Sequence, residues 1–212
     1  MRGRFLTFEG PEGSGKSTQS KRLALRLKES GREVVTTREP GGTPTGELIR
    51  DILQNDLTQE PSSAEAEMLL FAASRAQLVG RVILPALERG TWVISDRFAD
   101  SSTAYQGYGR GLDIDRVLAV NALAIGDAVP DRTFLLDIDV DTGFERLRVR
   151  HEDGEQQFDR IEREDKGFHE KVRRGYLDLA RQMPERFRVL NTLEPEDIVH
   201  DRIWEAVQEL MP

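Results

Sequence analysis

Hydrophobic positions along this chain follow two patterns that alternate from one end to the other. Short runs rich in apolar and β-branched residues occur at 4–8, 33–37, 91–95, 133–137 and 188–190. Such runs are typical of strands that are buried on both faces of a parallel sheet. The segments between them repeat apolar residues every three or four positions, as at Phe168, Val172, Tyr176 and Leu179. That spacing predicts helices with one buried face.

Local signals predict where some of these helices begin and end. The helix after the first strand is expected to end at Gly31, because glycine favours the left-handed turn that closes helices. Ser62 and Glu65 have the spacing of a capping box, which predicts that a long helix begins there. Pro85 lies late in that helical pattern and is expected to kink or end it.

Strands that alternate with helices predict an α/β fold. We expect a parallel sheet of about five strands, wound with right-handed crossovers and covered by helices on both faces, in three layers. No repeat, low-complexity tract or linker divides the sequence, so residues 1–212 are predicted to form a single domain. Ligands of such sheets bind at the carboxyl ends of the strands.

The first predicted strand runs into the stretch FEGPEGSGKST, at 8–18. This is a phosphate-binding loop (P-loop) in its expected context, after a strand and before a helix. The ammonium of Lys16 is expected to reach the β- and γ-phosphates of ATP, and the hydroxyl of Ser17 to help hold Mg²⁺. A glycine-rich turn that binds nothing would give Lys16 no role. The predicted ATP-binding residues are Gly10, Pro11, Glu12, Gly13, Ser14, Gly15, Lys16, Ser17 and Thr18.

A second polar pair closes the predicted strand at 91–95. Asp96 is a candidate Mg²⁺ ligand, because a carboxylate at a strand end can organise the ion and its water shell. The planar guanidinium of Arg97 suits a phosphate. A structural ion pair between these two residues is the alternative.

Composition narrows the possible functions. The chain has 212 residues, a formal net charge of -8, no cysteine and three histidines. The negative charge argues against general binding to nucleic acid, and the lack of cysteine excludes disulfides, cysteine-ligated zinc and thiol catalysis. With no uninterrupted apolar run near ~18 residues and no signal-peptide pattern, we expect a soluble, cytoplasmic protein that does not bind membranes.

Further motifs identify the class of nucleotide-binding protein. The guanine-recognition string Asn-Lys-x-Asp and the switch string Asp-x-x-Gly of small GTPases are both absent, which favours a small phosphotransferase. With the loop at 8–18, the stretches TREPGGT (37–43), LLFAASRAQ (69–77), SDRFADSSTAYQG (95–107) and FDRIERED (158–165) follow in order. In these motifs the chain resembles the bacterial thymidylate kinases, over its whole length.

The resemblance implies a binding site for the thymine base and the sugar. Phe71 matches the aromatic residue that stacks on the base, although a Phe in a helix is more often a core residue. Arg75, one turn further on, matches an arginine that contacts the base. Ser101 and Ser102 match residues near the pyrimidine, and Tyr105 matches a ring that crowds the sugar 2′ position.

The same resemblance implies how the rest of dTMP is held. Arg97 matches the arginine that grips the phosphate of dTMP, and Glu12 matches the carboxylate that accepts a hydrogen bond from the 3′-hydroxyl. A solvated loop acid is the alternative for Glu12. The triplet Arg38, Glu39 and Pro40 matches the loop that lines the acceptor side.

Gly13 occupies the position at which some family members carry a basic residue. Members without that residue supply the charge from a mobile lid, and the polar segment 146–163 is predicted to be this lid. Arg150 is the first candidate for the arginine that contacts the transferring phosphoryl group, and Arg148 is the second. A solvated basic helix face is the alternative.

The predicted function is therefore ATP-dependent phosphorylation of dTMP to dTDP, by in-line transfer from Mg-ATP. The catalytic candidates are Lys16, Arg97, Arg150 and Arg148. The resemblance also implies a homodimer that forms through the long helices between 62 and 126. A kinase for CMP, UMP or AMP and a non-catalytic nucleotide sensor are the alternatives. The sensor requires only one phosphate site, whereas this sequence predicts two.

Overall fold

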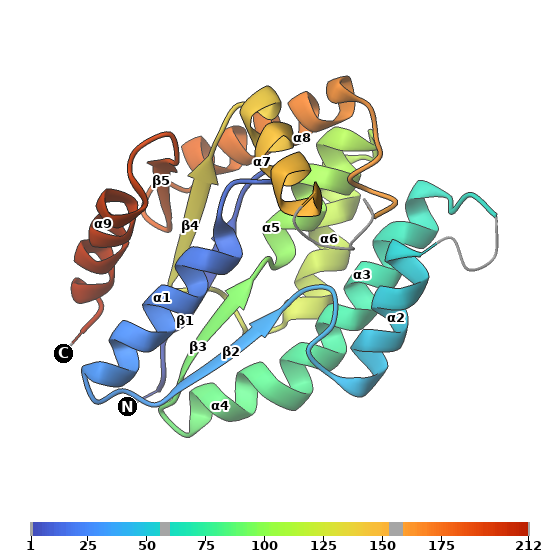
Figure 1. Ribbon diagram of the computed structural model, residues 1–212. Helices are drawn as coiled ribbons and strands as arrows, with labels where there is room; N and C mark the ends of the chain where they lie inside the picture. The colour runs from blue at the N-terminus through green and yellow to red at the C-terminus, as the bar shows by residue number, and fades with distance from the viewer. Residues whose placement is uncertain (1, 56–59, 153–158, 212) are drawn as a thin grey trace.

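Five parallel strands form the central sheet, in the order β2-β3-β1-β4-β5 (Figure 1). The computed structural model describes residues 2–55, 60–152 and 159–211, with side chains for all of these except 150–152. Each strand predicted from the sequence is present, and its ends differ from the prediction by at most one residue. The strands are β1 Phe5–Glu9, β2 Val34–Arg38, β3 Trp92–Asp96, β4 Arg132–Asp137 and β5 Phe187–Asn191.

Helices connect consecutive strands and cover both faces of the sheet, so the three-layer fold predicted from the alternating patterns is confirmed. Two of the helical segments, η1 and η2, are π-helical. The helical elements in the described part of the chain are α1 Lys16–Glu29, α2 Pro44–Gln54, α3 Ala64–Leu78, η1 Val79–Ile83, α4 Leu84–Glu88, α5 Ala99–Ser102, η2 Thr103–Gly109, α6 Ile114–Ile125, α7 Val140–Glu152, α8 Lys166–Gln182 and α9 Glu196–Gln208.

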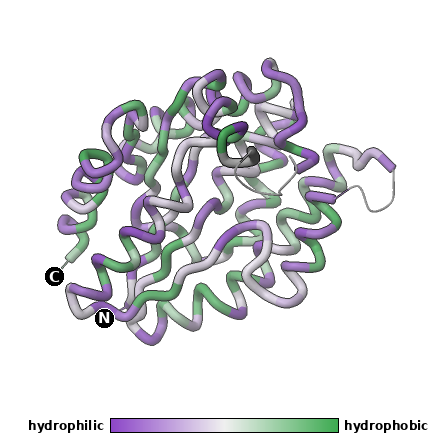
Figure 2. The backbone as a smooth tube through the Cα atoms, viewed as in Figure 1, coloured by the Kyte–Doolittle hydropathy of each residue, from purple (hydrophilic) through white to green (hydrophobic). Residues whose placement is uncertain are grey.

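Alternate residues of the strands pack into different helix layers. In β1, Leu6 and Phe8 face α1 and α9, and they form one core cluster with residues such as Leu27 and Ile203. Phe5 points the other way, into a cluster with residues of α3, η1 and α4. Because successive side chains of a strand point to opposite faces, both faces of β1 are buried, and three of its five residues are apolar. Figure 2 shows these apolar stretches in green along the strands.

A third cluster lies on the same face as the second, beyond β4. It packs Leu135 of β4 against residues of η2 and α8, among them Tyr105, Phe168 and Tyr176. Helix α8 packs against η2 along much of its length. The aromatic rings of this cluster reach the carboxyl edge of the sheet, so its packing supports the polar side chains found there.

Two predicted helix boundaries need correction. The cap of α3 is Ser63, whose hydroxyl accepts a hydrogen bond from the N–H of Ala66 at 3.2 Å, and not Ser62. Pro85 does not end the helix, because η1 precedes it and α4 continues after it, and the kink predicted as the other possibility stays a prediction. Proline has no N–H and its ring clashes with the carbonyl four residues earlier, so a wider π-turn just before it lets the helix continue.

The continuous helical stretch Ala64–Glu88 has the length and composition of a membrane-spanning segment. One such helix is weak evidence for a membrane protein, because core helices of soluble proteins pass the same test. Here the stretch carries the buried charged residues Glu67 and Arg75, and it contributes to the second core cluster. We therefore interpret it as a core helix.

The packing of α1 can be tested with two leucines of this helix, one buried and one exposed. Leu27 is fully buried, whereas Leu25 is 60% exposed. We expect Leu27→Ala to lower the free energy of unfolding by about 2–5 kcal/mol, because it removes buried methyl groups and leaves a cavity. Leu25→Ala should change it by less than about 0.5 kcal/mol. Urea unfolding of both variants tests this, and similar losses would contradict the assigned packing.

Candidate functional site

The P-loop connects β1 to α1 and wraps around the side chain of Lys16. Gly10, Gly13 and Gly15 all have positive φ, which lets the backbone fold tightly at the start of α1. The ammonium of Lys16 is buried in this loop and donates to the carbonyl of Pro11 at 2.7 Å and to that of Gly10 at 3.1 Å. The loop and the N-terminus of α1 together form an anion-binding site.

Burial and the neighbouring charges both affect the pKa of Lys16. Burial lowers its pKa to about 8, and the nearby guanidinium of Arg97 acts in the same direction, against the attraction of Glu12 and Asp96. An added anion would favour the charged form of the lysine. The geometry of Lys16 therefore fits a phosphate ligand.

Ser17 and Asp96 meet at the bottom of the site although 79 residues separate them. The Ser17 hydroxyl donates to a carboxylate oxygen of Asp96 at 2.5 Å. Parallel pairing of β1 with β3 brings the two residues together at the carboxyl edge of the sheet. One hydroxyl and one carboxylate are the hard oxygen donors that Mg²⁺ uses when phosphates and waters complete its shell, so the two predicted metal ligands fit that ion.

Arg97 leaves β3 in a left-handed backbone conformation, with φ of 70°. This conformation is rare for residues other than glycine, and it turns the side chain back across the sheet edge. Its guanidinium pairs with Glu12 and donates to the Tyr105 and Tyr176 hydroxyls at 3.2 and 3.1 Å. Asp96 points instead to Ser17, so the two neighbours do not form the predicted alternative, a simple ion pair with each other.

Glu12 is a partner of Arg97, and the acid is therefore not an isolated solvated group. Its carboxylate also accepts a hydrogen bond from the Tyr105 hydroxyl at 2.8 Å. Burial alone would raise the pKa of Glu12, but the charges of Arg97 and Lys16 lower it to about 2. Glu12 is thus a charged acceptor on the side of the cavity where Arg97 lies.

The packing around Gly13 explains why this position is a glycine, which the sequence alone did not reveal. A Cβ at Gly13 would lie 2.1 Å from the carbonyl oxygen of Gly143, and a Cβ at Gly143 would lie 2.5 Å from that of Glu12. The first turn of α7 therefore rests directly on the P-loop, backbone against backbone. No side chain fits at position 13 in this arrangement, which explains the absence of a basic residue there.

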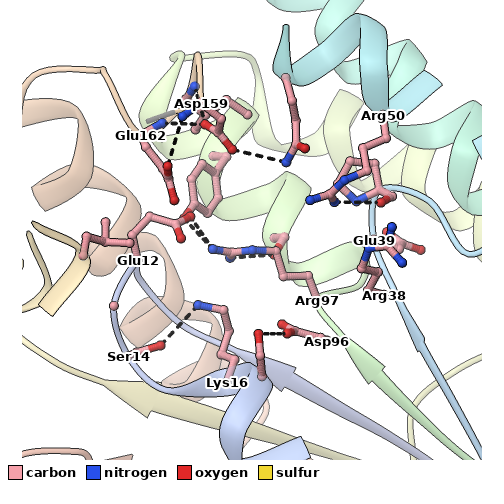
Figure 3. A pocket seen from close by; sticks show the side chains of 18 of the residues that line it. Glu12, Ser14, Lys16, Arg38, Glu39, Arg50, Asp96, Arg97, Asp159 and Glu162 are labelled. Atoms are coloured by element: carbon pink, nitrogen blue, oxygen red, sulfur yellow. Dashed lines mark hydrogen bonds and ion pairs between the residues drawn. The ribbon is translucent and has the colours of Figure 1, made fainter. Parts of the chain in front are cut away.

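A cavity of about 380 Å³ opens above these groups. Figure 3 shows Lys16 and Asp96 at its bottom, Arg97 across its middle, and Arg38 and Arg50 along one side. The cavity brings together most of the predicted site residues. Those that line it are Glu12, Gly13, Ser14, Gly15, Lys16, Ser17, Thr18, Arg38, Glu39, Pro40, Phe71, Asp96, Arg97, Ser101, Ser102 and Tyr105.

Phe71 and Arg75 lie on the same helix, α3, but the structure places them differently. Phe71 lines the cavity, whereas Arg75 is fully buried behind it. Its guanidinium pairs with Glu39 at 2.7 Å and donates to Ser102 at 3.0 Å and to Asn121 at 2.8 Å. Burial raises the pKa of Glu39, against the pull of Arg75. The described contacts make Arg75 the support of two cavity residues, and its contact with a base stays a prediction.

The predicted lid arginines lie in different surroundings. Arg148 is exposed on α7 and pairs with Glu145 at 2.8 Å, and the Arg150 side chain lies outside the described residues. Arg146 lines the cavity and donates to the carbonyl of Thr192 at 2.8 Å. Arg160 pairs with the buried Glu67 at 2.6 Å, so its charge is already balanced.

Several cavity residues were missed by sequence reasoning. Arg50, on α2, donates to the carbonyl of Pro40 at 3.0 Å, and burial lowers its pKa. Gln106, Asp159 and Glu162 lie within motifs shared with the thymidylate kinases, and that position could have indicated them. Arg50 and Gln54 lay outside every motif and had no such signal. The lining residues not predicted as site residues include Arg50, Gln54, Gln106, Arg146, Asp159 and Glu162.

A smaller cavity, of about 280 Å³, adjoins the first on the other side of the P-loop. Both cavities are lined by Gly13, Ser14, Gly15, Thr18 and Arg146. The P-loop therefore lies between the smaller cavity and the larger one, which contains Arg97. Two phosphate-binding groups that face one cavity are what a phosphotransferase requires. Fold and site together define the class of P-loop nucleotide kinases.

Comparison with known proteins gives the family. The chain belongs to the thymidylate kinase family, whose model matches residues 8–203. A thymidylate kinase of Halothermothrix orenii is 50% identical over 208 residues, which cover 98% of each chain. One from Deinococcus radiodurans is 48% identical over 208 residues, covering 98% of this chain and 97% of the relative. The crystal structure of thymidylate kinase from Ehrlichia chaffeensis superposes with a TM-score of 0.78 at 34% identity, covering 98% and 99% of the two chains. The predicted family and enzyme class are confirmed.

The contact between α7 and the P-loop can be tested with a matched pair of glycine variants. We expect Gly143→Ala to destabilise the protein by about 1–3 kcal/mol, because the new Cβ overlaps the carbonyl of Glu12. Gly80→Ala meets no atom within 4 Å and should be neutral or stabilising by up to about 1 kcal/mol. Thermal unfolding and the KM for ATP measure the effect. Equal stability of the two variants would show that the backbones do not touch.

Proposed function

We propose that the protein phosphorylates dTMP to dTDP at a site with two sides. The phosphoryl donor binds on one side of this site, and the acceptor binds on the other. The family supports this activity, with ATP as the phosphoryl donor. The observation that carries the division of labour is the position of Arg97, which faces the same cavity as Lys16 from a neighbouring strand. The sensor alternative and the other nucleoside-monophosphate kinases are not favoured by this family.

On the donor side, the triphosphate of ATP occupies the P-loop, residues Gly10 to Thr18. Lys16 binds the β- and γ-phosphates, and backbone N–H groups of the loop bind the remaining oxygens. The adenosine then lies in the smaller cavity, beside Arg146 and the loop that follows β5. We assign the adenosine to the smaller cavity because the larger cavity contains the residues predicted for dTMP.

Ser17 and Asp96 would hold Mg²⁺, either directly or through its waters. When bound, the ion neutralises charge that develops on the transferred phosphoryl group. The 2.5 Å contact between the two side chains places both oxygen donors beside the loop. The choice of Mg²⁺ rests on this hard-oxygen donor set.

On the acceptor side, Arg97 binds the dTMP phosphate and Glu12 accepts a hydrogen bond from the 3′-hydroxyl. Phe71 stacks on the base, a contact that contributes ~1–3 kcal/mol where bases stack on aromatic side chains. Tyr105 restricts the sugar, while Ser101, Ser102 and the turn 38–40 line the rest. The phosphate dianion attacks in line and needs no general base. Catalysis is thus positioning and charge stabilisation.

An arginine of the segment 146–163 covers the transferred group. Arg150 and Arg148 remain the candidates, with the backbone of α7 anchored on the P-loop at Gly143. Such an arginine contributes ~10³–10⁵ to the rate in related phosphotransferases. Residues 1–212 act as one domain, with this segment as its lid.

The active form is a cytoplasmic homodimer that pairs through helices between 62 and 126. Exposed apolar side chains on two of those helices support this surface, because a monomer gains nothing by keeping them in water. They include Leu69 on α3 and Leu118 and Leu123 on α6. The net charge of -8 argues against nucleic acid as a partner.

The function is tested by a panel of nucleoside monophosphates with Mg-ATP, read as coupled ADP release. We expect kcat/KM for dTMP to exceed that for CMP, UMP and AMP by at least about a hundredfold, because only the thymine base and deoxyribose satisfy the acceptor side. Preference for another monophosphate would overturn the acceptor assignment. ATP binding without turnover of any acceptor would favour the sensor.

Arg97→Lys tests the acceptor side while it keeps the positive charge. Lysine has no planar fork, so we expect kcat/KM for dTMP to fall about 10- to 100-fold with little change in the KM for ATP. Arg89→Lys is the matched control, since Arg89 is exposed and remote from the cavity. Normal dTMP turnover in Arg97→Lys would remove Arg97 from the proposed role.

A further inference from the structure

Glu9 is a fully buried carboxylate that lines neither cavity. It ends β1, directly before Gly10, and it is not among the residues proposed to contact ATP, Mg²⁺ or dTMP. One oxygen accepts a hydrogen bond from the N–H of Phe98 at 2.8 Å. The other accepts from the hydroxyls of Ser101 at 2.6 Å and Tyr176 at 3.0 Å. Three donors from two other elements thus converge on this one acid.

All three contacts act on Arg97. The bond to Phe98 holds the peptide that directly follows the left-handed backbone of Arg97, and such a conformation persists only where its surroundings fix it. The Tyr176 hydroxyl accepts a hydrogen bond from the Arg97 guanidinium at 3.1 Å, and Ser101 does so at 3.4 Å. Glu9 therefore supports both the backbone and the side chain of the acceptor arginine.

We propose that Glu9 is a positioning residue of the acceptor site, whose ionised carboxylate holds Arg97 in the orientation that binds the dTMP phosphate. The proposal rests on the assignment of Arg97 to that phosphate and deepens it. Glu9 touches no substrate, so its effect on the reaction passes through Arg97. A residue that served only packing would not need a charge, because burying one is unfavourable.

The electrostatics of Glu9 are consistent with this role. Burial raises its pKa to about 7, and the negative charge of Asp100 acts in the same direction, against the hydrogen bond from Ser101 and the charge of Arg97. With a pKa of about 7, Glu9 is about half ionised at pH 7 and mostly ionised at pH 8. The titratable groups that face Glu9 are Lys16 on α1, Arg97 and Asp100 after β3, Tyr176 on α8 and Arg186 before β5.

Glu9→Gln is the direct test, because glutamine has the same shape and no charge. At pH 8 we expect the KM for dTMP to rise about tenfold, since Arg97 loses its charged support, while the KM for ATP changes less than about twofold. Glu29→Gln is the matched control, as Glu29 is exposed on α1. Equal changes in the two KM values, or a KM for dTMP within about twofold of the wild type, would overturn the proposal.

A second readout separates positioning from a purely structural role. The folded pKa of Glu9 lies above the ordinary value, so the folded protein binds the extra proton between about pH 4.5 and 7. Stability from Glu9 is therefore lost as the pH rises through this window. We expect Glu9→Gln to gain Tm relative to the wild type between pH 5 and 8, although it loses dTMP affinity. A variant that loses Tm at pH 8 would contradict the proposal.

The pH dependence of dTMP binding should show the same group. Ionised Glu9 can accept all three hydrogen bonds, whereas the protonated acid cannot, so the wild-type KM for dTMP should rise as the pH falls below about 7. The second pKa of the dTMP phosphate, about 6, affects wild type and variant alike. Glu9→Gln should retain only that phosphate contribution. Identical pH profiles would overturn the proposal.

Tyr176→Phe tests the connection from Glu9 to Arg97 independently of whether Glu9→Gln folds well. Removal of this hydroxyl should raise the KM for dTMP, whereas Tyr108→Phe, a hydroxyl removal outside the network, should not. If both residues act through Arg97, the double variant with Glu9→Gln should be no worse than about twofold beyond the poorer single variant. Multiplied effects would overturn the relay. Lack of dTMP turnover in the wild type would instead refute the proposed function itself.

Discussion

The ion pair between Arg97 and Glu12 is the contact on which the site depends. It joins the end of β3 to the loop after β1, across 85 residues of sequence. Both partners are partly buried at the cavity wall, where a charge without a partner is costly. The tyrosine hydroxyls of Tyr105 and Tyr176 complete the surroundings of the guanidinium. This contact holds the carboxyl ends of β1 and β3 together where the cavity opens.

Buried charge is arranged in layers around the cavity. Arg97 and Lys16 line the cavity, and the acids Glu12 and Asp96 line it beside them. Arg75 and Glu39 form a fully buried ion pair next to the cavity. Glu67 is another buried acid, and it forms ion pairs with both Arg110 and Arg160. Segments that are far apart in the chain are held together at these points, because each ion pair joins residues of different segments.

Local patterns were sufficient for the strands and for the loop. Strands buried on both faces of a parallel sheet are mostly apolar, so the five strands could be predicted to within one residue. The cap at Ser63 and the π-turn before Pro85 could not, because adjacent serines offer the same signal and the response to proline depends on the packing around it. Phe71 and Arg75 share a helix face by spacing, yet only tertiary packing decides which of them reaches the cavity.

The sequence by itself determined the α/β fold, the P-loop, its lysine and the family to which the chain belongs. These follow from periodicity and contiguous motifs, in which neighbours in sequence are also neighbours in space. Tertiary structure alone decided the partner of each buried charge and the backbone contact between Gly13 and Gly143. It also placed Glu9 against Tyr176, 167 residues away. Long-range pairing follows from how the strands and helices assemble, and no local spacing encodes it.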